Sequence, residues 1–307
     1  MDTAAALVGP TASGKSQVAV QAALYCGGEI LSCDSVQVYR GMDIGSGKIR
    51  PEERRGVVHH LLDIASPLEE YTVAHYQQDA RRLIRELNNK ERLPLLCGGT
   101  GLYLRAALDD YTFSEEAGSQ PVREELRERL SREGSEALHG ELATVDPEAA
   151  GRLHPKDGVR ILRALEVYLL TGKPIGERHR ARRESLYRTM MFGLEVERSL
   201  LYERVEQRVD AMVREGLVGE TRALLEAGVS PDAKAMQTLG YRHMVPVVLG
   251  KQELDQAVYL MKRDTRRYAK RQLTWFRRDP RIQWLPANTA EELQDAARAI
   301  GEALRKL

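Results

Sequence analysis

The chain has 307 residues, of which 42% are hydrophobic and 30% are charged. This length suits one large domain or two ordinary ones, and the composition excludes an intrinsically disordered protein. No apolar run reaches the ~18 residues that a spanning helix needs, so we expect no membrane protein, and we find no secretory signal pattern. Three widely spaced cysteines argue against a zinc site or a disulfide framework and favour a reducing, cytoplasmic setting.

Charge is balanced over the whole chain but concentrated in one segment. There are 46 Lys and Arg against 45 Asp and Glu, which gives a formal net charge of +1. Residues 262–281, however, contain nine basic residues and only two acidic ones. A basic stripe on a neutral protein favours a polyanionic partner such as nucleic acid, and the plainer alternative is a solvated charged face.

Strand and helix patterns alternate in the first third of the chain. Each buried apolar or β-branched run is followed by a helical pattern or a polar loop, which predicts an α/β fold with a parallel sheet flanked by helices. We expect strands at about 3–9, 29–33, 57–64 and 93–97, and helices at about 17–26, 72–90 and 101–108, with Thr72 as a cap.

The pattern changes after about residue 113. Residues 114–187 read as helices with few strand signals, and the run 188–196 reads as a strand that returns to the sheet. The remainder is mostly helical, with a short strand near residue 282 and a capping box at Thr289. We therefore predict a core domain, residues 1–113 plus 188–307, interrupted by an all-helical insertion domain, residues 114–187.

A phosphate-binding motif lies between the first strand and the first helix. Residues 9–16 read GPTASGKS, which fits G-x-x-x-x-G-K-[ST] in the context that the mechanism requires. Such a loop turns backbone N–H groups toward phosphate oxygens, while Lys15 would bridge the terminal phosphates and Ser16 would bind Mg²⁺. The predicted diphosphate or triphosphate site comprises Gly9, Pro10, Thr11, Ala12, Ser13, Gly14, Lys15 and Ser16. The motif does not distinguish an ATP-driven kinase from an enzyme that uses another diphosphate.

Two further polar segments follow strands of the predicted sheet. Asp34 opens the loop after the second strand, and residues 98–101 form a Gly-Gly-Thr-Gly turn after another strand. The carboxyl ends of parallel strands share one edge, so both segments should lie beside the phosphate loop. From its position, Asp34 could hold a metal, cap a helix or act as a base.

Several motifs together resemble the tRNA dimethylallyltransferase (isopentenyltransferase) family. They are GPTASGKS, DSVQVYRGMDIGSGK, HHLLDI, GGTGLY, HPKDGVRILRALEVYLLTGKP and KRQLTWFRR, in this order along nearly the whole chain. The resemblance implies a P-loop NTPase-like core and transfer of a dimethylallyl group from dimethylallyl diphosphate to the exocyclic amine of the adenine 3′ to the anticodon. It also implies Mg²⁺, a cytoplasmic monomer, and an insertion domain that covers the anticodon stem-loop of tRNA.

The resemblance assigns roles to residues. Asp34 would be the catalytic base, with Thr100 beside it, and Lys15 would stabilise the leaving diphosphate. Arg204 and Arg208 lie on the helix after the returning strand. We expect one of them, taken here as Arg204, to help bind the diphosphate, with a surface ion pair as the alternative. The residues expected to touch tRNA are Asp34, Ser35, Val36, Gln37, Thr100, Val159, Arg160, Ile161, Leu162, Arg163, Gln237, Gly240, Tyr241, Arg242, Lys270, Arg271 and Arg277.

Three other functions stay open from the residues themselves. A small-molecule kinase would use the same loop for ATP. A prenyltransferase acting on free adenine nucleotides would need neither the insertion nor the basic stripe. A P-loop protein that binds RNA without catalysis would show binding and no turnover.

Overall fold

The computed structural model describes residues 1–111, 120–175 and 185–307. The chain divides into two compact units, one made of Met1–Leu108 with Ser185–Leu307 and the other of Asp109–Glu184. The boundaries that we predicted from the sequence, 113/114 and 187/188, lie within a few residues of these divisions. In the described part of the chain, no helix is long and apolar enough to cross a membrane.

The larger unit is built on a parallel sheet. Its described residues form six strands in the order β3-β2-β4-β1-β5-β6, and every pair of neighbours runs parallel. This confirms the α/β class expected from the alternating pattern. The strands are β1 (Thr3–Val8), β2 (Glu29–Ser32), β3 (His59–His60), β4 (Pro94–Gly98), β5 (Arg188–Glu195) and β6 (Ile282–Pro286).

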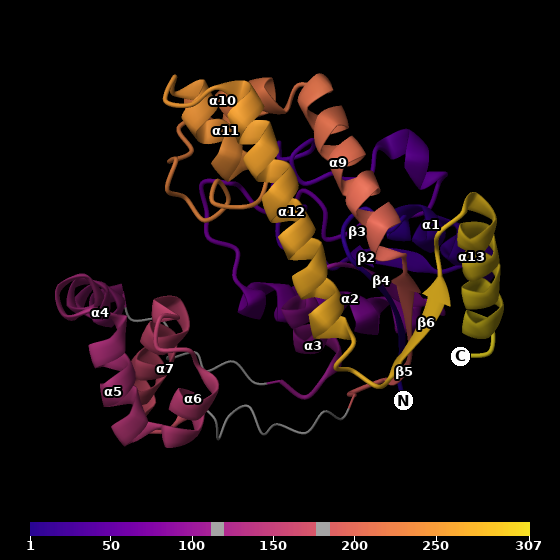
Figure 1. The fold of residues 1–307 in the computed structure, drawn as a ribbon. Coiled ribbons are helices and arrows are strands. Elements are labelled where there is room, and N and C mark those ends of the chain that lie inside the picture. Colours follow the sequence, from indigo (N-terminus) through magenta and orange to yellow (C-terminus); the bar gives the residue numbers. More distant parts are fainter. Residues whose placement is uncertain (112–119, 176–184) are drawn as a thin grey trace. The chain divides into compact units, whose positions relative to one another are not determined.

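Helices cover both faces of the sheet (Figure 1). On β1, Ala5 and Leu7 point into a core shared with α1 (Lys15–Cys26) and α13 (Ala290–Leu304). The alternate residues Ala4 and Ala6 point into a second core, shared with α2 (Val73–Asn89) and α3 (Gly101–Leu108). Because side chains alternate along a strand, a central strand buried on both faces reads as one continuous apolar run.

The predicted cap residues lie at helix ends as expected. Thr72 accepts a hydrogen bond from the His75 N–H at the start of α2, and Thr289 accepts one from the Glu292 N–H at the start of α13.

The predicted third strand was too long, because only His59 and His60 pair with β2. Leu61 and Asp63 have φ angles of 62° and 57°, which turn the backbone out of the extended conformation.

A helical layer follows β5 in the same unit. It comprises α9 (Arg198–Arg214), α10 (Leu217–Glu226), α11 (Tyr241–Val248) and α12 (Leu254–Phe276). In Figure 1, α10 and α11 lie together at one end of α12, and α9 and α12 extend to the sheet. Its core includes Met212, Met244 and Met261 and also takes in Val38 and Met42 from the loop after β2. That loop is therefore held between the sheet and the helical layer.

In the smaller unit, the described residues form helices, as predicted for the insertion. They are α4 (Gln120–Glu133), α5 (Ser135–Val145), α6 (Pro147–Arg152) and α7 (Gly158–Thr171). The short 3-10 helix η1 (Pro51–Arg54) is part of the larger unit instead. Asp157 caps α7 and Gly172 ends it with a left-handed φ of 64°. Leu126, Leu138 and Ile161 are fully or almost fully buried in the core of this unit.

Candidate active site

Three segments meet at the carboxyl edge of the sheet, as their positions after strands predict. They are the phosphate loop (residues 9–16) after β1, the Asp34 loop (residues 34–48) after β2, and the glycine turn (residues 98–101) after β4. A cavity of about 310 Å³ lies among them and is closed by residues of the helical layer. Its lining includes Thr11, Lys15, Ser16, Asp34, Ser35, Val36, Gln37, Gly98, Arg208, Gln237, Arg242, Tyr268, Arg271 and Gln272.

A second cavity reaches the phosphate loop from another side. It has a volume of about 430 Å³ and is lined by Ala12, Gly14 and Gln17 together with Ile49, Glu53 and Arg55. Both cavities share Lys15, Ser16, Gly47 and Arg208. The phosphate loop is therefore open to two hollows that meet at these four residues, so one ligand could reach it from each side.

The backbone of the phosphate loop has the shape of an anion-binding turn. Ala12 and Gly14 both have left-handed φ angles, 64° and 85°. At Gly14 a Cβ would lie 2.9 Å from Leu293 Cδ2, so glycine is required there for packing as well. Ser13 Oγ is buried without a hydrogen-bond partner among the described residues. Polar groups of the loop are therefore available to bind an anion.

Lys15 lies folded against its own loop. Its Nζ donates to the Pro10 carbonyl oxygen at 3.0 Å. The residue is partly exposed and lines both cavities. Burial lowers the pKa of Lys15, while the nearby Cys97 and Asp34 act in the opposite direction. A bound anion would supply the counter-charge that this ammonium group lacks.

Arg204 is not part of the anion site, contrary to our prediction. Its guanidinium donates to the backbone carbonyls of Ala287 and Asn288, which lead into α13, and it lines neither cavity of the phosphate loop. Arg208, one turn further along α9, lines both cavities. Burial lowers the pKa of Arg208 and Asp34 opposes that shift. Arg208 is thus the arginine of α9 that faces the phosphate loop.

Asp34 caps the start of its own loop with one oxygen. Its Oδ1 accepts hydrogen bonds from the Val36 N–H at 2.8 Å and the Gln37 N–H at 3.3 Å. Its Oδ2 accepts none within the described chain. Thr100 lies beside it, with Oγ1 accepting the Ser35 N–H at 3.2 Å. The capping role is therefore occupied by one oxygen, and the second is left for a ligand in the cavity.

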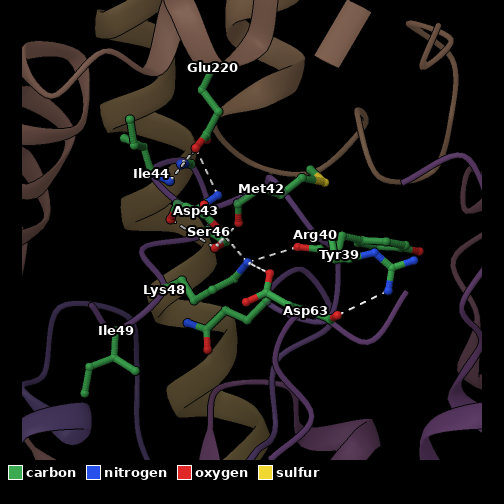
Figure 2. Close-up of polar contacts among 12 residues, drawn as sticks. Tyr39, Arg40, Met42, Asp43, Ile44, Ser46, Lys48, Ile49, Asp63 and Glu220 are labelled. Carbon is green, nitrogen blue, oxygen red and sulfur yellow. Dashed lines mark hydrogen bonds and ion pairs between the residues drawn. The ribbon is translucent and has the colours of Figure 1, made fainter. Parts of the chain in front are cut away.

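The Asp34 loop is fixed by two charged side chains that the sequence reasoning missed (Figure 2). Glu220 accepts the backbone N–H groups of Asp43, Ile44 and Gly45 and the Tyr241 hydroxyl at 2.6 Å. The Lys48 side chain is only 4% exposed and donates to Asp43, to Asp63 and to the Tyr39 carbonyl. The motif GSGK contained Lys48, but no local signal pointed to Glu220, which lies on α10.

The residues of the larger unit that we expected to touch RNA do not all lie in one place. Gln37, Gln237, Arg242 and Arg271 line the 310 Å³ cavity with Asp34 and Ser35. Tyr241 is fully buried and bonded to Glu220, so its side chain is not available to RNA. Lys270 and Arg277 line a separate hollow of about 540 Å³. Gly240 packs on Gly45, where a Cβ would lie 3.4 Å from the Gly45 carbonyl oxygen.

Acidic residues neutralise much of the basic stripe, which the sequence pattern did not reveal. Asp264 binds Arg242, Arg263 and Arg267, and residues of α9 bind two more cations, in the pairs Lys262–Asp210 and Arg266–Glu206. Arg277 pairs with Glu195. Lys270, Arg271 and Arg278 have no ion-pair partner among the described residues, so the available positive charge is smaller than the count suggests.

In the smaller unit, the predicted RNA segment 159–163 has two faces. Val159 is 80% exposed, and Arg160 is exposed beside Asp157. Ile161 is fully buried, and Leu162 is partly buried against the same core, so the side chain of Ile161 is enclosed. Arg163 pairs with the buried Glu166 at 2.7 Å. The exposed side chains of this segment are the ones left for an RNA contact, which stays a prediction.

Relatives of known family match nearly the whole chain. The model of the family described as IPP transferase matches residues 37–279. A tRNA dimethylallyltransferase from Carboxydothermus hydrogenoformans is 47% identical over 299 residues, which cover 97% of this chain and 96% of that protein. Another, from Geobacter sulfurreducens, is 50% identical over 284 residues, which cover 91% of each chain.

Solved structures agree with these relatives. A tRNA isopentenylpyrophosphate transferase from Bacillus halodurans has a TM-score of 0.74 at 40% identity, covering 100% of this chain and 98% of its own. A eukaryotic dimethylallyltransferase, described as acting on tRNA, has a TM-score of 0.83 at 26% identity, covering 98% of this chain and 78% of its own. The chain belongs to the IPP transferase family, whose members named here are tRNA dimethylallyltransferases.

Proposed function

We propose that this enzyme transfers the dimethylallyl group from dimethylallyl diphosphate to the exocyclic amine of the adenine 3′-adjacent to the anticodon in tRNA, releasing diphosphate. The observation that carries the proposal is that Lys15 and Asp34 line one cavity. A group that stabilises a leaving diphosphate and a group that accepts a proton thus face the same space. The names of the relatives supply the substrate class.

On the phosphate side, the phosphate loop, Lys15 and Arg208 would hold the diphosphate. When the bond from the allylic carbon to oxygen breaks, both electrons leave with the diphosphate and its negative charge increases. Cations and N–H groups fixed before the reaction stabilise that charge without reorganising. The burial that lowers the pKa of Lys15 also shields this charge interaction from water.

A magnesium ion fits this site through Ser16. Ser16 is exposed to both cavities and its hydroxyl has no side-chain partner among the described residues. The described chain contains no cluster of three or more metal-binding side chains, which suits a cation held mainly by phosphate oxygens and water. When bound, Mg²⁺ would neutralise part of the charge on the diphosphate.

On the adenine side, Asp34 would act as the base through Oδ2. The exocyclic amine is a weak nucleophile, so removing its proton as the N–C bond forms helps the reaction. The adenine must leave the stacked anticodon loop to reach Asp34, at a cost of a few kcal/mol. Thr100, whose Oγ1 holds the Ser35 N–H, would keep this loop in place.

The RNA contacts are proposed in the same cavity and on the insertion domain. Gln37, Arg242 and Arg271 line the cavity and would meet the anticodon loop. The insertion domain would cover the anticodon stem-loop, with Val159 and Arg160 on its exposed surface. We also propose that the enzyme acts in the cytoplasm, where the tRNA substrate is found, and that it is a monomer.

The other functions fit the molecule less well. A kinase acting on a small molecule has no need for Arg242 and Arg271 in the lining of the 310 Å³ cavity. An enzyme that prenylates free adenine nucleotides has no use for an insertion domain. A protein that binds RNA without catalysis has no need for an Asp34 Oδ2 that faces the 310 Å³ cavity without a hydrogen bond.

The test is incubation with radiolabelled dimethylallyl diphosphate, Mg²⁺ and unmodified tRNA, followed by nucleoside analysis. We expect label on the adenosine beside the anticodon and release of diphosphate without added ATP. Label on free AMP or ATP in place of tRNA would favour the nucleotide prenyltransferase. Transfer of phosphate from ATP would favour the kinase, and tRNA binding without any turnover would favour the RNA-binding protein.

A further inference from the structure

Helix α12 lies so close to the glycine turn that two of its positions, Gly99 and Gly101, have no room for a Cβ atom. A Cβ on Gly99 would lie 2.1 Å from Gln272 Nε2, and one on Gly101 would lie 2.0 Å from Trp275 Nε1. Contacts under 3 Å do not occur between real Cβ atoms and their neighbours. The two glycines therefore let α12 approach the turn that carries Thr100.

Gln272 uses both ends of its amide at this contact. Its Oε1 accepts the Thr11 N–H at 2.9 Å, and its Nε2 donates to the Gly99 carbonyl oxygen at 3.0 Å. The side chain is only 6% exposed. One side chain thus joins the phosphate loop to the glycine turn, and only an amide of this length offers both a donor and an acceptor there.

Each partner of Gln272 belongs to a different half of the proposed reaction. Thr11 lies in the phosphate loop that would hold the diphosphate. Gly99 precedes Thr100, whose N–H donates to the Cys33 carbonyl at 3.1 Å and whose Oγ1 accepts the Ser35 N–H. The bonded series from Gln272 therefore reaches the backbone on both sides of Asp34, the residue assigned to the adenine.

We propose that Gln272 is a positioning residue that sets the distance between the bound diphosphate and the adenine amine; this rests on the proposed function. It lies between Arg271 and Arg277, which the resemblance assigned to RNA, but its amide bonds to protein backbone. Misplacing reacting groups by 1 Å can cost about 10²-fold in rate. A shifted amine also leaves the allylic carbon open to water, so prenyl diphosphate would be hydrolysed without transfer.

The variants are Gln272→Met, which keeps the volume and loses both hydrogen bonds, and Gln272→Glu, which keeps the acceptor and loses the donor. Thr274→Ala is the matched control, because Thr274 is on the same helix, is exposed and bonds only to Lys270 of its own helix. Each is assayed for single-turnover transfer, for dimethylallyl alcohol release, for tRNA affinity and for thermal unfolding.

We expect both Gln272 variants to slow transfer by about 10²-fold at saturating substrates, with tRNA affinity unchanged within about 3-fold. The fraction of prenyl diphosphate lost to dimethylallyl alcohol should rise in both, and the control should behave as the unaltered enzyme. Transfer within 3-fold of the unaltered enzyme, or slow transfer with no rise in alcohol, would overturn the proposal. A loss of tRNA affinity at an unchanged rate would instead make Gln272 an RNA contact.

If Gln272→Met fails to fold, Gln272→Glu decides, since it keeps the shape of glutamine and replaces only the amide NH2 with a carboxylate oxygen. The failure of the proposed function is seen separately, because the unaltered enzyme would then not label tRNA at all. With the unaltered enzyme active, the partition between transfer and hydrolysis tests Gln272 alone.

Discussion

The guanidinium of Arg208 donates to the Gly47 carbonyl oxygen at 3.4 Å, and this pair stands where the two cavities of the phosphate loop meet. A Cβ on Gly47 would lie 1.6 Å from Arg208 Nη2, so only glycine permits the contact. Arg208 is therefore held over the phosphate loop by the end of the Asp34 loop. The loop that carries the proposed base also positions a cation of the diphosphate site.

Arg208→Ala should impair the diphosphate step. We expect a fall of about 10²–10³-fold in transfer, because a donor to developing charge is lost. Arg204→Ala is the matched control on the same helix face, since its guanidinium binds the carbonyls of Ala287 and Asn288. That variant should unfold at a lower temperature and keep its KM for dimethylallyl diphosphate. Steady-state kinetics with both variants check this, and equal kinetic effects would contradict the assignment.

Asp34→Asn should separate the two roles of Asp34. The amide oxygen can still accept the Val36 and Gln37 N–H groups, but the side chain no longer accepts the proton of the amine. We expect transfer to fall by about 10²–10⁴-fold and tRNA affinity to stay within a few-fold. Single-turnover rates and filter binding measure the two effects. A variant with normal turnover would exclude a base at this position.

The sequence predicted those parts of the site whose signals are local. The phosphate loop, the loop after β2 and the glycine turn after β4 depend on residues within a few positions, and so do the helix caps at Thr72 and Thr289. Arg204 and Arg208 lie one turn apart on one helix face, so periodicity could not tell which of them reaches the phosphate loop. The contact that decides it, between Arg208 and Gly47, joins residues that are 161 positions apart.

Long-range hydrogen bonds and ion pairs explain two other differences from the prediction. Glu220 reaches the Asp34 loop across 175–177 positions, and the basic stripe is neutralised by α9, whose register against α12 no sequence pattern reveals. The early end of β3 has a different cause. The left-handed conformations of Leu61 and Asp63 are unfavourable for side chains and are held by tertiary contacts, among them the hydrogen bond from the Asp63 N–H to the Gln37 carbonyl.

Glu220→Ala should destabilise the Asp34 loop. The change leaves three backbone N–H groups and the Tyr241 hydroxyl without their acceptor, at about 1–3 kcal/mol for each group that stays buried. We expect a lower midpoint of urea unfolding and weaker binding of both substrates. Glu226→Ala, an exposed change on the same helix, is the control. Equal midpoints for the two variants would show that Glu220 does not hold the loop.

The affinity for diphosphate should decrease at alkaline pH, and the decrease should begin at a lower pH than it would if Lys15 were an exposed lysine. Burial lowers the pKa of Lys15, and only the protonated amine attracts the anion. Above this lowered pKa, Lys15 is neutral in the free enzyme but protonated in the complex. Diphosphate binding must then take up a proton, and the affinity weakens about tenfold per pH unit. The same deprotonation relieves the cost of burying the charge, so Lys15 favours folding more as pH rises through that range. Lys15→Arg should remove the alkaline decline in diphosphate affinity, measured by calorimetry from pH 7 to 10, and a decline that persists in Lys15→Arg would assign it to another group.

Arg271→Glu should weaken tRNA binding more than Arg267→Glu. Arg271 lines the 310 Å³ cavity and has no ion-pair partner among the described residues. Its guanidinium carbon lies 5.7 Å from the centre of the Tyr268 ring. Arg267 already faces Asp264 at 3.6 Å, so part of its charge is neutralised. We expect Arg271→Glu to reduce the slope of log affinity against log salt by about 1, because one phosphate contact is lost. Arg267→Glu should change that slope less, and binding titrations between 50 and 200 mM salt compare them. Equal slopes would mean that the tRNA backbone does not reach Arg271.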